Sequence, residues 1–230
     1  MITVVMSALN EEKNIQKSFK RLINALILFK YKYQIILIDD GSKDKSHLIL
    51  KNISVKNKKN TLFFKNKINR GIGYCLYKSA KLAKYNYLLF YPSDGEIDPI
   101  QILKYKKYLL EKKDLIIPYP ANQLLTRPKF RYYLSNIYQS IIRIFFLKKI
   151  KYFNGTIIFK KELIFKLNIF SRRFFIFSEI ILKYLKYNKN YVEVPYLLKK
   201  RLSGKSKAVN FTNLKEVIIS FIKMMKFYYL

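Results

Sequence analysis

The chain has 230 residues, half of them hydrophobic, which excludes a disordered polypeptide and is typical of a folded domain. Lysine and arginine together number 46 against 14 acids, and the formal net charge of +32 would by itself favour nucleic acid or an anionic membrane as partner. However, 38 of the 46 are lysines, and these are spread along the whole chain. We therefore expect mostly solvated surface charge and no nucleic-acid partner, with anionic lipid or phosphate as the target of the remainder.

The single cysteine, Cys75, excludes an internal disulfide, and no cluster of histidine and cysteine has the spacing of a metal site. The first residues lack the basic region of a signal peptide, and no run of 18 apolar residues occurs. The sequence therefore predicts a cytoplasmic protein that does not span a membrane.

Up to about residue 120, short apolar runs alternate with longer amphipathic segments. The apolar runs predict strands at 2–6, 34–39, 61–65, 86–91 and 114–118. The amphipathic segments predict helices at 11–29, 43–55, 72–84 and 99–112. Strands and helices in alternation predict an α/β fold with a mainly parallel central sheet and helices on both faces.

The pattern is less regular after residue 120. A loop with several prolines leads into an aromatic, basic helix at 131–149, and the stretch NGTIIF predicts a strand. A helix is expected at 176–188, and YVEVPY predicts a strand that runs into the polar loop RLSGKSK. We expect one domain over residues 1–210, followed by an amphipathic C-terminal helix at 211–230.

Acidic residues follow three of the predicted strands. Glu11 comes after the first strand, Asp39 and Asp40 end the second, and Asp94 and Glu96 follow the fourth. Because ligands of parallel sheets bind beyond the carboxyl ends of the strands, we expect these acids to share one cavity. Their oxygens can accept hydrogen bonds from a nucleotide base, or hold Mg²⁺ or Mn²⁺ against a diphosphate.

Four motifs in chain order carry a resemblance to a known family: VVMSALNEEKNI, ILIDDGSKDKS, NKINRGIGYCLYKSA and LLFYPSDGEIDP. With this set the chain resembles the family 2 inverting glycosyltransferases, which have the GT-A fold, a Rossmann-like fold of nucleotide-diphospho-sugar transferases. Within that family it is most similar to polyprenyl-phosphate sugar synthases such as dolichol-phosphate mannose synthase. The stretches NGTIIFKKEL, FSEIILKYL and VPYLLKKRLSGKSKA extend the likeness over nearly the whole chain.

The resemblance implies a site for a UDP- or GDP-linked sugar, with Asp39 on the base and Mg²⁺ or Mn²⁺ on Asp94. It places acceptor-phosphate contacts at Arg127 and Arg131, and a catalytic or orienting role at Glu179. The donor-binding residues that it implies are Ser7, Leu9, Asn10, Glu11, Asp39, Asp40, Ser93, Asp94, Glu96, Arg201, Ser206 and Lys207.

The chain departs from the family pattern at three places. Ser7 replaces the proline of the first motif, and Pro92 replaces the first acid of the Asp-x-Asp metal pair. The arginine expected after the fifth strand is absent from IIPYPANQ. Only Asp94 then remains as the metal ligand of that pair, with Glu96 as a further oxygen donor, and an inactive relative of the family is an alternative interpretation.

The favoured function is inverting transfer of a sugar to a polyprenyl phosphate, by an enzyme attached to the inner face of the membrane. Helices 131–149 and 212–229 combine apolar side chains with lysine and arginine, which suits shallow insertion beside anionic headgroups. The alternative acceptor is a hydroxyl of a cell-surface glycan or lipopolysaccharide precursor, which would need Glu179 as a base. The identities of the sugar and of the base stay open.

Structural roles compete with each of these assignments. Asp39 and Asp40 could cap the helix that follows, as Ser42 and Asp44 are expected to do. Asn10 and Glu11 could likewise serve as helix cap and first-turn acid. Glu179 could pair with a lysine, the two arginines Arg127 and Arg131 could be surface charge, and Cys75 is expected to be a buried small apolar residue.

Overall fold

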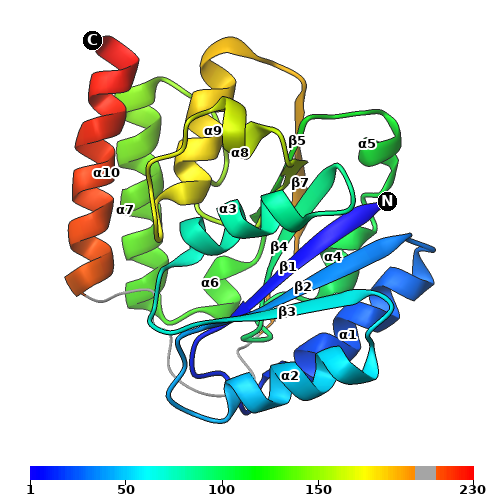
Figure 1. The fold of residues 1–230 in the computed structure, drawn as a ribbon. Coiled ribbons are helices and arrows are strands. Elements are labelled where there is room, and N and C mark those ends of the chain that lie inside the picture. Colours follow the sequence, from blue (N-terminus) through cyan, green and yellow to red (C-terminus); the bar gives the residue numbers. More distant parts are fainter. Residues whose placement is uncertain (200–210) are drawn as a thin grey trace.

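The computed structural model describes residues 1–199 and 211–230. Within these residues one seven-stranded sheet has the order β3-β2-β1-β4-β6-β5-β7 (Figure 1). Neighbouring strands are parallel except that β6 is antiparallel to both β4 and β5, so the predicted mainly parallel sheet is confirmed. The strands are β1 (Ile2–Ala8), β2 (Tyr33–Asp40), β3 (Thr61–Asn66), β4 (Tyr87–Pro92), β5 (Leu115–Pro120), β6 (Ile158–Lys160) and β7 (Tyr191–Tyr196).

Helices cover both faces of this sheet. One face carries α1 (Ile15–Leu28), α2 (Ser46–Lys56), α4 (Pro99–Leu103) and α5 (Lys107–Leu110). The other face carries α3 (Ile72–Leu82), α7 (Lys129–Phe146), α8 (Leu163–Lys166), α9 (Ile176–Tyr187) and α10 (Phe211–Tyr229). A short helix, α6 (Gln123–Thr126), lies just before α7 and has no buried residue.

The continuous apolar runs of the strands explain this arrangement. Successive side chains of a strand point to opposite faces, so Val4 and Met6 pack into the core beneath α1, while Val5 packs into the core beneath α3 and α9. A strand that is apolar at every position can therefore be buried on both sides, as parallel strands usually are. The buried Cys75 belongs to the second core, as expected, and burial raises the pKa of its thiol.

Two predicted helices differ from the observed ones. The helix expected at 11–29 begins only at Ile15, because the backbone N–H groups that precede it are bonded to side chains of the 42–46 loop. The helix expected at 99–112 is divided into α4 and α5, because the backbone N–H groups of Tyr105 and Tyr108 donate to the carbonyls three residues earlier, not four as in an α-helix. The remaining helices lie within a few residues of their predicted positions.

The antiparallel direction of β6 decides which residues reach the functional edge of the sheet. The carboxyl ends of β1, β2 and β4 lie along one edge, and β6 runs the opposite way between β4 and β5. Its N-terminal end therefore lies at that edge, and the residues before it, around Tyr152 and Asn154, face the same cavity as the strand ends.

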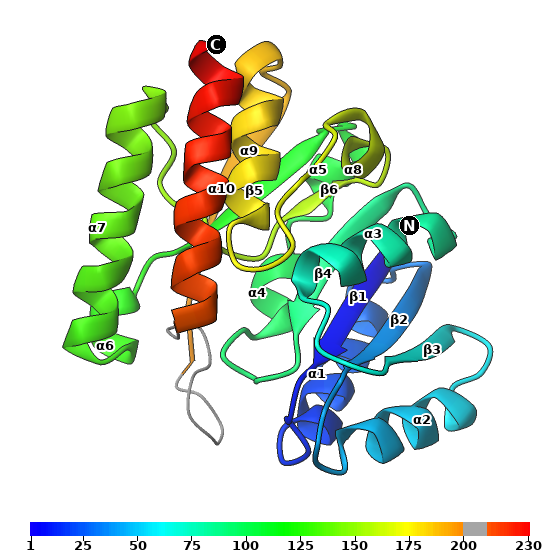
Figure 2. The same cartoon turned by 60° about the vertical axis from the view of Figure 1, so that its left-hand side comes forward.

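The C-terminal helix α10 packs beside α7 and α9 (Figure 2). Phe221 of α10 makes edge contacts with Phe145 and Phe146 of α7, at centroid distances of 5.3 and 5.5 Å. Lys186 of α9 donates to the carbonyl of Phe227. No helix in the described part of the chain is both long enough and apolar enough to cross a membrane.

Candidate active site

A cavity of about 320 Å³ lies at the carboxyl ends of the parallel strands. Most of the residues that the sequence motifs assigned to the donor line it together, namely Ser7, Leu9, Glu11, Asp40, Ser93, Asp94 and Glu96. Arg127 and Arg131, expected on the acceptor side, line it as well. The predicted Arg201, Ser206 and Lys207 lie outside the described residues.

Asp40 is held firmly at the end of β2. Its Oδ1 accepts from Asn66 Nδ2 at 2.8 Å and from the N–H of Arg70 at 2.9 Å, and its Oδ2 accepts from the N–H of Gly71 at 2.9 Å. These three donors tie the ends of β2 and β3 to the start of α3. A side chain held by this many donors has a fixed orientation, so Asp40 keeps its place in the cavity lining.

Asp39 lies beside the cavity and is not part of its lining. Its side chain is buried, and Oδ1 accepts from the N–H of Ser42 at 3.1 Å. Its Oδ2 is buried without a hydrogen-bond partner among the described residues. A buried carboxylate oxygen without a donor is costly, which distinguishes Asp39 from a plain loop anchor.

The loop after β1 is tied to the loop after β2. Asn10 has a positive φ of 51°, accepts from the N–H of Lys43 at 2.7 Å, and donates its own N–H to the hydroxyl of Ser42. Asn10 does not line the cavity, because these bonds turn it toward the 42–46 loop. Glu11 lines the cavity and accepts from Asn14 Nδ2 at 2.7 Å. The first motif therefore contributes Glu11 to the cavity, while Asn10 fixes the loop.

The two substituted positions of the family motifs lie side by side. Ser7 of β1 and Pro92 of β4 are partners in the parallel register. Next to them, Ser93 donates its hydroxyl to the carbonyl of Ser7 at 2.9 Å, and Ser18 donates to the carbonyl of Ser93 at 2.9 Å. Ser93 is thereby a tie between β4 and β1. The family pattern has its proline at the β1 position of this register pair, whereas this chain has serine there and its proline at the β4 position.

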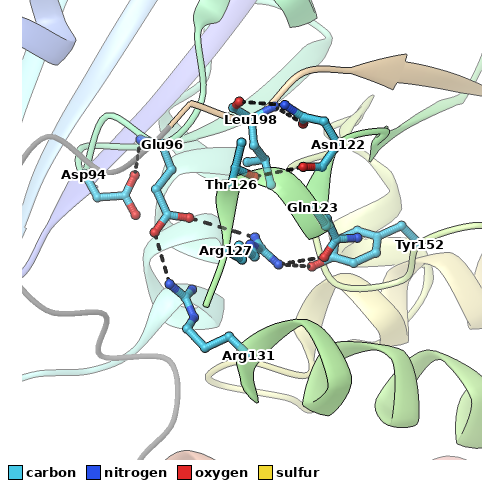
Figure 3. A network of polar contacts seen from close by, with 9 residues as sticks. All are labelled: Asp94, Glu96, Asn122, Gln123, Thr126, Arg127, Arg131, Tyr152 and Leu198. Carbon is cyan, nitrogen blue, oxygen red and sulfur yellow. Dashed lines mark hydrogen bonds and ion pairs between the residues drawn. The ribbon is translucent and has the colours of Figure 1, made fainter. Parts of the chain in front are cut away.

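Glu96 joins the acidic loop to the arginines (Figure 3). Its carboxylate lies 3.4 Å from Arg131 Nη1 and 3.9 Å from Arg127 Nη2. Asp94 precedes it on the same loop and accepts the N–H of Glu96 at 3.1 Å. Arg127 also donates to Tyr152 at 3.1 Å and to Gln123 at 2.9 Å. The cavity thus has an acidic side on the strand ends and a basic side on α6 and α7.

Glu179, expected as a catalytic or orienting residue, is not in the cavity. Its side chain has an exposed fraction of 0%, and it forms an ion pair of 2.7 Å with Lys183, which is 4% exposed. Its two oxygens also accept the N–H groups of Phe170 and Ser171, at 2.9 and 2.8 Å. No acceptor can reach a carboxylate buried in this way, so the lysine pairing is the correct interpretation of Glu179.

Arg173 is a cavity residue that the sequence motifs did not identify. It lies in the segment fixed by Glu179, and its guanidinium donates to Asn69 at 3.2 Å. Gly73 allows this approach, because a Cβ there would lie 2.3 Å from the carbonyl oxygen of Ser171. The signal that could have found it is the arginine itself: arginines number only 8 in this lysine-rich chain.

The sheet order, the single antiparallel strand and the acid-lined cavity at the strand ends agree with the GT-A fold that the sequence motifs predict. The chain belongs to glycosyl transferase family 2, whose sequence profile matches residues 3–174. An uncharacterized protein of Methanocaldococcus jannaschii is 33% identical over 109 residues. That match covers 46% of this chain and 45% of the curated relative, so the chain spans less than half of that protein's length.

Solved structures of glucosyl-3-phosphoglycerate synthase from Mycobacterium tuberculosis have the same fold. A complex of that enzyme with Mn²⁺, UDP and phosphoglyceric acid matches with a TM-score of 0.69 and 18% sequence identity. The match covers 98% of this chain and 78% of that one. A complex with Mg²⁺ and UDP matches with a TM-score of 0.68 and 18% identity, covering 98% and 79% of the two chains. The likeness establishes the fold.

Proposed function

We propose that this protein transfers a sugar from a UDP- or GDP-linked donor to an acceptor that bears a phosphate, with inversion at the anomeric carbon. The observation that carries the proposal is the pairing of Glu96 with Arg127 and Arg131 inside the cavity that also holds Asp40 and Asp94. The acids lie on the strand ends, where nucleotides bind in sheets of this kind. The arginines offer the planar, bidentate donors that suit a phosphate.

The residues present fit a divalent ion on the acidic side. Mg²⁺ in phosphate-handling sites usually takes one or two carboxylates and completes its shell with water and substrate phosphates. No cluster of three metal-type side chains occurs in the described ranges, so Asp94 would share the ion with the donor diphosphate. Mg²⁺ or Mn²⁺ bound there would offset the negative charge that builds on the departing diphosphate. The mycobacterial synthase was solved with either ion.

Transfer to a phosphate oxygen requires little proton transfer by the protein. An acceptor phosphate oxygen attacks the anomeric carbon from the side opposite the diphosphate, and the bond from that carbon to the diphosphate breaks with its electron pair. A phosphate is already anionic near neutral pH, so the attacking oxygen needs no strong general base. Arg127 and Arg131 would hold the acceptor phosphate in line, and Arg173 lies across the same cavity to contact further phosphate.

Among phosphate-bearing acceptors we favour a polyprenyl phosphate. Leu124 and Leu125 of α6, which come shortly before Arg127 in the chain, are exposed and could contact a lipid chain. The phosphoglyceric acid bound by the mycobacterial synthase is the water-soluble alternative. With that acceptor the arginines would hold the phosphate, and the free hydroxyl of the glycerate would attack and lose its proton to a base other than the buried Glu179. A glycan hydroxyl loses its main support, because the buried Glu179 cannot act as its base.

Replacing Arg131 by Gln should raise the KM for the acceptor about 10- to 100-fold and leave the KM for the donor unchanged, because a charge-assisted hydrogen bond to phosphate is lost. The measurement is initial-rate kinetics with each substrate varied in turn. Lys129→Gln removes an exposed cation two residues earlier on α7 and serves as the control. Equal effects of the two substitutions would mean that Arg131 acts only as surface charge.

Replacing Asp39 by Asn should weaken donor binding about tenfold and relax the preference between uracil and guanine, because an amide presents a donor where the base N–H needs an acceptor. Binding of UDP and GDP is measured by calorimetry. Asp44→Asn, in the same loop, is the control: Asn can still accept the N–H of Ser46, and the lost contact to the N–H of Glu12 lies away from the cavity lining. Unchanged discrimination in Asp39→Asn would leave Asp39 as an anchor for Ser42.

A further inference from the structure

We infer that the outer faces of α6, α7 and α10 form one surface that binds an anionic lipid membrane, with the cavity opening at its edge. The inference rests on the proposed function at one point only, the reason why the cavity should lie at the membrane surface. The surface itself follows from the exposure and charge of its residues, and is called the α7/α10 face below.

The α7 part of this face is a continuous apolar stripe. Phe130, Ile137, Ile141 and Ile144 have exposed fractions of 70, 57, 41 and 69%. Their spacing of seven, four and three residues places them along one side of a helix. The opposite side carries the buried Ile142 and Phe146. A helix that is already packed on one side has no need of a second apolar side in water.

The α10 part is a second row of exposed apolar residues on the helix that packs beside α7. Leu214, Ile218 and Ile222 are exposed at successive spacings of four residues. The two helices meet at Phe145, which packs against Phe221 and accepts a hydrogen bond from the hydroxyl of Tyr229. Both ribbon views show α7 and α10 side by side, with α6 at the end where both begin (Figures 1 and 2).

Charge decides what covers this face. Lys215 and Lys226 are exposed along α10 beside the apolar residues, and the whole chain carries +32. A second copy of the chain would bring the same lysines and the same excess charge to the contact, which is repulsive. An anionic bilayer offers acyl chains for the stripe and negative headgroups for the lysines. Because neither helix can cross the bilayer, both would lie in its interface.

The face also places the site at the membrane surface. Arg131 in the first turn of α7 and Asn213 in the first turn of α10 both line the cavity. The two helices that would lie in the interface thus begin at the arginine side of the site. If the acceptor is a lipid phosphate, its head can reach Arg131 while its chain stays among the lipids.

The chain contains no tryptophan, which permits a site-specific test. Ile144→Trp places a single indole on the α7/α10 face, and Val55→Trp places one on α2, at a site of the same exposed fraction, 69%. With vesicles containing phosphatidylglycerol, without donor or acceptor, we expect a blue shift of emission and quenching by brominated lipid for Ile144→Trp only. The shift should be weaker with purely phosphatidylcholine vesicles, and partly reversed by salt.

A double variant tests the face by vesicle sedimentation. Ile137→Glu with Ile144→Glu should lower binding at least tenfold, while Val55→Glu should not, and both variants should melt like the parent because the three positions are exposed. Equal shifts of the two indoles, or unchanged sedimentation of the double variant, would overturn the inference. So would dimers of the parent, seen by light scattering, that the double variant abolishes. None of these readouts depends on sugar transfer, so the proposed function can fail separately.

Discussion

Asp94→Asn is expected to reduce turnover at saturating donor by two to three orders of magnitude, in line with the several kcal/mol that a metal ion contributes to stabilising a developing charge. The amide has nearly the shape of the carboxylate but lacks the charge that a divalent ion requires. Pro92, at the other position of the motif, has no oxygen ligand in its side chain, so it cannot compensate. Added Mn²⁺ should rescue the variant only in part.

The control for this prediction is the same substitution four residues later in the chain. Asp98 caps α4 through the N–H of Ile100 and pairs with Lys199, away from the cavity lining. Asn caps helices as well as Asp does, so Asp98→Asn should keep near-parental turnover. An Asp94→Asn enzyme with parental turnover and parental metal response would make Asp94 a turn residue and remove the metal from this loop.

Glu179→Ala is expected to lower the free energy of unfolding by about 3–5 kcal/mol, because it leaves the buried charge of Lys183 without its partner. The N–H groups of Phe170 and Ser171 would lose their acceptors as well. The measurement is chemical denaturation of the purified protein. Loss of turnover should follow loss of folded protein, since Glu179 acts through the segment that carries Arg173.

The chain supplies a matched control for this pair. Glu162 and Lys166 are also four residues apart on a helix, but their side chains are exposed, and an exposed pair contributes about 0.3–0.5 kcal/mol. Glu162→Ala should therefore change stability little. The variant Glu179→Gln provides the contrary test. If it kept full stability but lost turnover and changed the pH profile, Glu179 would have a catalytic role.

The sheet and the acidic edge could be predicted from the sequence because both depend on local patterns. Apolar runs such as Ile35–Ile38 specify a strand that is buried on both faces. An acid that directly follows such a run is recognised as lying at the strand end from the neighbouring residues alone. Parallel topology then brings the ends of β1, β2 and β4 to one edge. Asp40, Asp94 and Glu11 were found in the cavity for this reason.

The errors arose where long-range contacts set a side chain's role. Glu179 has the same neighbours in sequence whether it faces a cavity or a buried lysine, and only the packing of 168–171 against α9 decides between them. Asn10 turns away from the cavity because Lys43, on another loop, donates to it. Arg173 reaches the cavity because Gly73 lets the chain pass close to α3. None of these contacts produces a periodic pattern in the sequence from which it could have been predicted.

The most direct measurement is a transfer assay on the parent protein with a panel of UDP- and GDP-sugars, Mn²⁺, and either a polyprenyl phosphate or 3-phosphoglycerate as acceptor. Mass spectrometry identifies the product, and NMR of its anomeric proton gives the configuration. We expect release of nucleoside diphosphate and an inverted sugar on a phosphate-bearing acceptor, preferentially the lipid, with loss of product in Asp94→Asn. Folded protein that binds no nucleotide with Mn²⁺ and transfers sugar to neither acceptor would contradict the proposed function.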